Sequence, residues 1–308
     1  MRSPLAVVFA LCAALLYGTG NALEHRVVNV TDRDPRLHVG LLVRLARSPL
    51  WLLGMFGDVA AFGFQAAALA YGNLLFVQPL LVCGLLVGLP LSAHWSGRRM
   101  RTYEYVTAAV LCAALAVFLI VADPSGGTTE APVGRWVGLG GTVAALVVVA
   151  VVAALKTRSH VRAALLGFAA GGLFGITAAL TRTFVDQIQQ GVPYTAHHWE
   201  VYALAVLSVV GILFTQHGFQ NASLSASLPA LESTEPVIAA TLGVLLFHEQ
   251  INGRSTLDNL VIALSIVALL TCVVLLAVDA GRRAPSESPR AEPAVRAAAR
   301  TRADRVTG

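Results

Sequence analysis

Nine long stretches of mostly apolar residues constrain the fold of this chain more than any other feature of its sequence. A helix needs about 20 such residues to cross the hydrocarbon core of a bilayer. The stretches lie at approximately 5–23, 50–71, 74–94, 104–122, 136–155, 161–185, 200–219, 222–247 and 258–279. This pattern predicts an all-α, polytopic membrane protein with about nine transmembrane helices.

The composition of the 308-residue chain excludes most soluble classes of protein. Charged residues make up 13% and hydrophobic residues 56%, and the mean hydropathy is +0.70. Soluble proteins carry roughly 25% charged residues, so this chain has too few to cover a soluble surface. Its net charge of +5 comes from bases at helix ends and in the tail. We therefore expect the lipid bilayer, and not nucleic acid, as its partner.

The sequence holds none of the common motifs that bind nucleotides or carry hydrolytic chemistry. It has no phosphate-binding loop, no dinucleotide-binding glycine pattern, no HExxH and no GxSxG. We therefore expect no enzymatic activity and no cofactor.

Basic residues predict the orientation of the chain, because cytoplasmic loops of membrane proteins are rich in Lys and Arg. With the N-terminus outside and nine helices threaded in order, 18 of the 22 basic residues fall inside. The four outside are Arg2, Arg135, Arg182 and Arg254. This bias predicts a multi-pass protein of the cell membrane with its N-terminus outside and its C-terminus in the cytoplasm.

The two segments that do not read as spans are the connection 24–49 and the tail 280–308. Within the connection, the apolar run from Leu37 to Val43 is too short to span, and we expect it to lie at the membrane interface. The tail is rich in Arg, Ala, Pro and Glu without apolar periodicity, so we expect it to be disordered and cytoplasmic. The transmembrane domain is therefore expected over 1–279.

The chain contains an internal repeat. The pairs of similar stretches are Leu16–Leu23 with Leu173–Leu180, Gln78-Pro79 with Glu235-Pro236, and Phe64-Gln65-Ala66 with Phe219-Gln220-Asn221. The first two pairs are offset by 157 residues and the third by 155. They predict one repeat over about 5–155 and a second over about 161–279, an imperfect 5+4 arrangement. The first repeat has an odd number of helices, so the second is inverted, as in many secondary transporters.

The order of these features resembles the drug/metabolite transporter (EamA-like) superfamily, and most closely its nine-helix NIPA-like branch. The residues that carry the resemblance are Ser48-Pro49-Leu50-Trp51-Leu52-Leu53-Gly54, Gly57-Asp58, Phe62, Ala67–Tyr71, Val77–Leu80, Trp199, Gln216, Phe219, Pro236 and Phe247-His248-Glu249. The resemblance implies an all-helical transporter built from inverted repeats. NIPA-like members are associated with magnesium transport, and other members of the superfamily export metabolites, amino acids or drugs.

Three acidic residues at membrane depth are the leading candidates for a binding site, because charge there is costly and marks function. Asp58 lies in the second apolar stretch, and Glu232 and Glu235 share one face of the eighth. The carboxylates are either protonated structural acids or sites that exchange protons against a cation. They suit a hydrated Mg²⁺, an organic cation or a proton equally well.

Uncharged polar residues form a second set of candidates. Asn21, Gln65 and Gln78 rank highest, because they fall in the repeated stretches. Each either contacts solute or forms an interhelical hydrogen bond. By contrast, the pairs Glu24-His25 and His248-Glu249 are expected to be solvated helix ends.

Glycines recur every four residues at Gly167, Gly171 and Gly175, a small-residue face that allows close approach of another helix. We expect packing within the protein, with a gate or a homodimer as alternatives. The sequence as a whole predicts a transporter that moves a small solute by alternating access past Asp58, Glu232 and Glu235. The alternatives are a transporter of Mg²⁺ or another divalent cation, and a non-transporting membrane scaffold.

Overall fold

The computed structural model describes residues 3–28, 39–95, 102–122, 125–157, 159–221, 224–251 and 255–283. Within these ranges, helices occupy each of the nine apolar stretches. They are α1 (Pro4–Val28), α3 (Pro49–Tyr71), α4 (Leu74–Leu81) with the 3₁₀ turn η1 (Val82–Gly84) and α5 (Leu85–Trp95), α6 (Thr102–Ala122), α7 (Val133–Lys156), α8 (Ser159–Gln189), α10 (Trp199–Asn221), α11 (Leu224–Leu245) and α12 (Thr256–Arg283). The short elements are α2 (Gly40–Leu45), α9 (Val192–Ala196), β1 (Ser125–Gly126) and β2 (Glu249–Gln250), and the two strands pair antiparallel.

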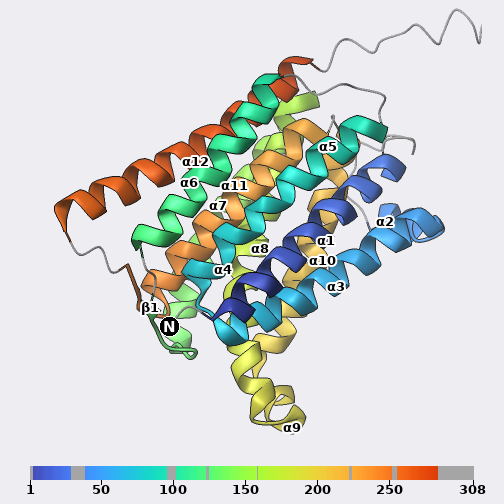
Figure 1. Ribbon diagram of the computed structural model, residues 1–308. Helices are drawn as coiled ribbons and strands as arrows, with labels where there is room; N and C mark the ends of the chain where they lie inside the picture. The colour runs from blue at the N-terminus through green and yellow to red at the C-terminus, as the bar shows by residue number, and fades with distance from the viewer. Residues whose placement is uncertain are drawn as a thin grey trace, which may run out of the picture.

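The long helices form a bundle (Figure 1), and the length and apolar composition of several of them fit a membrane-embedded protein. Six helical stretches among the described residues are long and apolar enough to cross a bilayer. They are Pro4–Val28, Pro49–Tyr71, Leu74–Trp95, Val133–Lys156, Val161–Gln189 and Trp199–Gln220. The all-α membrane architecture expected from the sequence is confirmed at this level, and the count of nine crossings stays a prediction.

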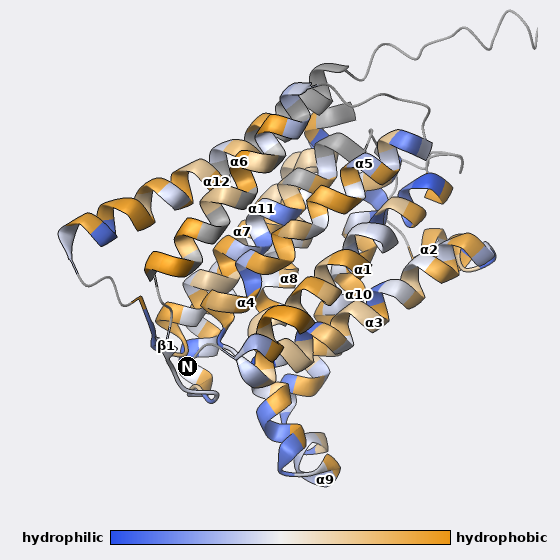
Figure 2. Cartoon of the chain, viewed as in Figure 1, coloured by the Kyte–Doolittle hydropathy of each residue, from blue (hydrophilic) through white to orange (hydrophobic). Residues whose placement is uncertain are grey.

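The outer surface of the bundle is apolar, as contact with lipid requires. Large hydrophobic side chains such as Phe56, Val137 and Leu257 are about 70% exposed, at 71%, 69% and 72%. Figure 2 shows apolar residues along most of the exposed helix faces. In water such a surface would aggregate, so the pattern matches a membrane-embedded chain.

Helix α8 is the central helix of the bundle. In the most apolar 18-residue segment of α8, 78% is buried inside the protein, whereas the corresponding segment of α7 is 22% buried. It packs against α7, α10 and α11, while α1 packs against α3, α4 and α5. The contact expected of Gly167, Gly171 and Gly175 is confirmed as packing within the protein. A Cβ added at these positions would meet Ser227, Leu231 and Ile238 of α11 within 2.6 Å.

Local sequence sets where the third span begins and bends. Asn73 caps α4, because its side chain accepts a hydrogen bond from the Phe76 amide at 3.1 Å. Pro79 lies inside the helix and cannot donate a backbone hydrogen bond. The chain then tightens into η1 and continues as α5. The single stretch expected at 74–94 is therefore one helical span, Leu74–Trp95, with a 3₁₀ turn at its middle.

The sequence predicts an interfacial apolar run in the connection 24–49 and a disordered tail at 280–308. The apolar run near Leu41 includes the short helix α2, whose Leu41 and Leu45 are buried beside Val28 and Trp51. It therefore packs on the protein, and the part of the connection at 29–38 lies outside the described residues. The tail also lies mostly outside them, because the description ends with α12 at Arg283.

Candidate functional site

A cavity of about 430 Å³ lies in the interior of the bundle, within the usual size range of small-molecule sites. Helices α1, α3, α8, α10 and α11 supply most of its wall. The lining residues are Tyr17, Asn21, Glu24, Met55, Asp58, Val59, Phe62, Gln65, Leu81, Phe174, Thr177, Thr181, Phe184, Val201, Leu204, Ala205, Ser208, Ile212, Thr215, Gln216, Leu231, Glu232 and Glu235. The cavity thus joins helices of both halves of the chain.

Four acidic side chains line the cavity: Glu24, Asp58, Glu232 and Glu235. Among the lining residues that the structure describes, none is Lys, Arg or His. The rest of the wall is largely aliphatic and aromatic. Because an apolar surround weakly screens charge, a cavity of this kind favours positively charged occupants and disfavours anions.

Five of the six candidates named from the sequence line this cavity. Asp58, Glu232 and Glu235 do so, and so do the uncharged Asn21 and Gln65. These residues come from three helices, so the fold brings together side chains that are far apart in the sequence.

Gln78, the sixth candidate, is placed elsewhere. It is 1% exposed on α4 and is not among the cavity-lining residues. Neither polar atom of its side-chain amide has a hydrogen-bond partner within the described part of the chain. Its prediction as a cavity residue rested on the repeat alone.

Glu24 was assigned by sequence to a solvated helix end, and that assignment is wrong. Helix α1 continues to Val28, so Glu24 lies within it and is 1% exposed. The neighbouring His25 is also buried, with its ring edge-on to Phe219 at 5.7 Å between centroids. Helical spacing could have found Glu24, because Tyr17, Asn21 and Glu24 follow one another at the intervals that define one helix face.

A chain of polar contacts holds Glu24 from the second half of the protein. The Gln216 side-chain amide on α10 donates to the Glu24 carboxylate. Gln216 in turn accepts a hydrogen bond from the Trp51 indole at 3.3 Å. These contacts join α1, α3 and α10 beside the cavity and fix the rotamer of the glutamine.

Tyr17 and Gln65 form a further contact across the cavity wall. The Tyr17 hydroxyl donates to the Gln65 side-chain oxygen at 2.8 Å. The bond joins α1 to α3 about two helical turns from Glu24 and from Asp58. It is a specific polar contact between the two helices.

Two glycines let α1 and α3 approach closely at the acidic residues. A Cβ at Gly20 would lie 2.3 Å from Asp58 Oδ1, and a Cβ at Gly54 would lie 2.8 Å from Glu24 Cγ. Both distances are far inside van der Waals contact. Glycine at each position therefore makes the space that the carboxyl groups of the opposite helix occupy.

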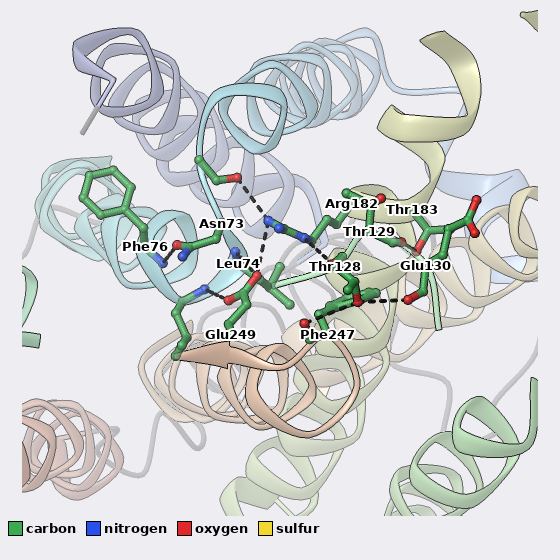
Figure 3. Close-up of polar contacts among 12 residues, drawn as sticks. Asn73, Leu74, Phe76, Thr128, Thr129, Glu130, Arg182, Thr183, Phe247 and Glu249 are labelled. Atoms are coloured by element: carbon green, nitrogen blue, oxygen red, sulfur yellow. Dashed lines mark hydrogen bonds and ion pairs between the residues drawn. The ribbon is translucent and has the colours of Figure 1, made fainter. Parts of the chain in front are cut away.

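Arg182, the basic residue nearest to the acids by sequence, is committed to a separate cluster (Figure 3). Its guanidinium lies 3.2 Å from Glu249 Oε1 and donates to the Gly72 carbonyl at 3.2 Å. It also lies over the Phe247 ring, 5.8 Å from the centroid. Arg182 therefore does not neutralise the cavity acids.

Glu249 is the second correction to the helix-end assignments. It is 2% exposed, and its two carboxylate oxygens accept from the Leu74 and Leu75 amides at 2.9 and 2.8 Å. These are free donors of the first turn of α4, so Glu249 caps that helix. Its neighbour His248 is exposed and contacts Arg135. The cluster is a structural junction of α4, α8 and β2.

The described residues contain no cluster of side chains that could coordinate a metal ion directly. Within the ranges that the structure covers, no three His, Cys, Asp or Glu side chains gather closely enough to hold one metal ion. A hydrated Mg²⁺ keeps several waters and needs one or two carboxylates. Asp58, Glu232 and Glu235 as ligands of a divalent cation therefore stay a prediction.

Comparison with known proteins gives one relative of nearly equal length. An uncharacterized protein of Corynebacterium glutamicum is 32% identical over 292 residues, which cover 93% of this chain and 98% of the relative. The chain belongs to the same family as that protein. No protein-family model matches the chain, and no solved structure does.

Proposed function

We propose that the protein is a secondary transporter that moves a small solute across the cell membrane by alternating access. The observation that carries the proposal is the acid-lined cavity of about 430 Å³ inside an apolar helical bundle. Buried carboxyl groups at membrane depth are costly and are retained where they serve a solute or ion. A pathway through the bundle accounts for both their position and the lack of basic partners among the described lining residues.

The proposed inverted repeat gains support from the cavity wall. Five pairs of lining residues are separated by 157 residues, the offset of two of the three repeated stretches, while the repeated stretch on α3 and α10 is offset by 155. The pairs are Tyr17 and Phe174, Glu24 and Thr181, Met55 and Ile212, Asp58 and Thr215, and Val59 and Gln216. Residues at this spacing in both halves line one cavity, which is what a site between two repeats would require.

The repeat supplies the acids asymmetrically. Glu24 and Asp58 of the first half correspond to threonines of the second, Thr181 and Thr215. The second half contributes its own acids from α11. The sequence resemblance favours membership in the drug/metabolite transporter superfamily, and the bias of basic residues favours a chain with its N-terminus outside and its C-terminus in the cytoplasm.

Transport of Mg²⁺ or another divalent cation is the second candidate. The oxygen-rich, negatively charged lining favours it, because Mg²⁺ prefers oxygen ligands. The large apolar part of the same wall favours an organic cation instead. A membrane scaffold without transport is the third reading, alone or as a homodimer, and it assigns the cavity no solute.

Flux into proteoliposomes separates these readings. The purified chain would be tested with Mg²⁺, choline and putrescine, with and without a pH gradient, beside Asp58→Asn and Glu232→Gln. Glu130→Gln is the matched control, because that carboxylate is exposed on a connection away from the cavity. We expect flux of at least one cation that both cavity variants lose and the control keeps. Flux of Mg²⁺ alone would select the divalent reading.

Absence of flux for every probe, with folded protein in the vesicles, would overturn cation transport and leave the scaffold. Flux that survives both cavity variants would remove the carboxylates from the pathway. Folding is monitored by size-exclusion profile and thermal unfolding in detergent.

A further inference from the structure

Glu24 and Asp58 face each other across the contact between α1 and α3. Both side chains line the same cavity, Asp58 Oδ1 lies 2.3 Å from a Cβ placed at Gly20, and Glu24 Cγ lies 2.8 Å from a Cβ placed at Gly54. The close approach at Gly20 and Gly54 brings them there, since each glycine lies against the acid of the opposite helix. Two acidic residues 34 positions apart in the sequence thus form one pair.

Each acid of the pair has a buried oxygen without a donor. Glu24 Oε2 accepts from Gln216, while Glu24 Oε1 and Asp58 Oδ1 have no hydrogen-bond partner in the described part of the protein. Ionised carboxylates only accept hydrogen bonds. Two such acceptors side by side leave both unsatisfied, which is unusual for buried polar atoms.

The groups around the pair do not supply positive charge. Tyr17 on α1 and Glu232 and Glu235 on α11 are the titratable neighbours that face it. On α10 the facing group is the uncharged Gln216, and on α8 the lining residues are Thr177, Thr181 and apolar side chains. The buried histidines His25 and His217 are not cavity-lining residues. Arg182 is bonded to Glu249.

One hydrogen bond between the two carboxyl groups satisfies both orphaned oxygens. A single proton supplies the donor: one acid becomes a carboxylic acid, and the other stays a carboxylate that accepts from it. It also removes the repulsion of two like charges in an apolar surround, the reason that paired carboxyl groups elsewhere share a proton. When the proton leaves, it passes to water in the adjoining cavity, and no covalent bond other than O–H changes.

We propose that Glu24 and Asp58 together bind one proton beside the cavity, with Gln216 as the positioning residue. The site itself follows from the arrangement of the pair. Its use in coupling a proton gradient to solute movement rests on the proposed function. The rival occupant of the same oxygens is a monovalent metal cation such as Na⁺ or K⁺.

Infrared spectroscopy of the full chain in lipid tests the site without any solute. A protonated carboxyl group has a carbonyl band that is lost on ionisation and shifts in D₂O. Among the titrating carboxyl bands of the chain, we expect one that disappears in Glu24→Gln and in Asp58→Asn alike, because the remaining carboxylate has no second one to share with. The double variant should lose no more than either single variant, and Glu130→Gln should lose none of it.

A band unchanged in either single variant would overturn the shared site, because the proton would then belong to the other acid alone. So would losses in the two single variants that sum in the double variant, since they would indicate two independent protons. If no band lost in both single variants is present at any pH at which the native chain stays folded, and Na⁺ or K⁺ raises its thermal unfolding midpoint, the metal cation occupies the pair.

Variants that keep a carboxyl group at both positions test the site with a smaller risk of unfolding the protein. Glu24→Asp and Asp58→Glu retain both acids but change their separation, so the band should persist at a shifted frequency. Gln216→Leu should shift it as well, because the lost donor bonds Glu24 directly. The infrared result does not depend on flux. A shared proton in a protein that shows no flux would support the proton site and overturn the proposed transport function.

Discussion

Arg182 and Glu249 form a buried ion pair, with Arg182 Nη1 3.2 Å from Glu249 Oε1, that ties the central helix α8 to the start of α4. The side chains are 9% and 0% exposed. Both carboxylate oxygens of Glu249 also accept hydrogen bonds from backbone amides in the first turn of α4. The pair is therefore a structural joint rather than part of the cavity.

Replacing Glu249 by Ala should destabilise the protein strongly. The change leaves the buried Arg182 charge without its carboxylate partner. It also leaves the Leu74 and Leu75 amides of α4 without their hydrogen-bond acceptor. Breaking a buried pair from one side costs about 3–5 kcal/mol. Thermal unfolding in detergent measures it, with Glu130→Ala as the exposed control. An unfolding midpoint equal to that of the control would contradict the assigned role.

Gly20→Ala should disturb the site more than its small size implies. The added Cβ would lie 2.3 Å from Asp58 Oδ1, so the carboxyl group or the helix has to move. We expect a loss of about 1–3 kcal/mol, typical of overpacking, and loss of the flux that Asp58 supports.

Gly63→Ala is the matched control on α3, because nothing lies within 4 Å of its added Cβ. Alanine there should be neutral or stabilising by up to about 1 kcal/mol, since it is the better helix former. Equal effects of the two substitutions on unfolding and flux would show that close approach at Gly20 is not required.

Gly171→Ala should loosen the contact between α8 and α11. Its Cβ would lie 2.5 Å from the Leu231 carbonyl oxygen, a backbone atom that cannot rotate away. We expect destabilisation of about 1–3 kcal/mol and a displaced Glu235, whose amide lies 3.2 Å from the same Cβ. Gly138→Ala on α7, with open space around it, should leave unfolding unchanged. A native unfolding midpoint for Gly171→Ala would exclude tight packing there.

Tyr17→Phe should have a modest effect on stability. It removes one hydrogen bond of 2.8 Å to Gln65 and keeps the ring. The expected cost is about 0.5–1.5 kcal/mol. A double-mutant cycle with Gln65→Leu isolates the bond, and its coupling energy should account for most of the loss. A coupling energy near zero would mean that the hydroxyl stabilises the protein through another partner.

The helical architecture and most of the cavity acids were predictable, because charge at membrane depth is visible in a hydropathy pattern. Asp58, Glu232 and Glu235 stand out against apolar neighbours. Glu24 did not, since it sits where the apolar run of the first stretch ends. Whether such a residue is solvated depends on where the helix stops, and α1 continues to Val28.

The contacts between distant residues were beyond sequence reasoning. Glu249 looks like the polar end of a span, but its partners Leu74 and Leu75 lie about 175 residues away. Gln78 was selected only because its stretch resembles the one around Glu235, and Glu235 lines the cavity while Gln78 does not. Similarity between two short stretches does not determine what each side chain faces.

The close approach at Gly20 and Gly54 bears on how the interior could open to either side of the membrane. The two helices leave room at these points only for the carboxyl side chains, so α1 and α3 are expected to move together. Under the proposed alternating access, rearrangement would then occur where this helix pair meets the rest of the bundle. The hydrogen bond from Gln216 to Glu24 spans that boundary, and it can break and re-form without leaving a void.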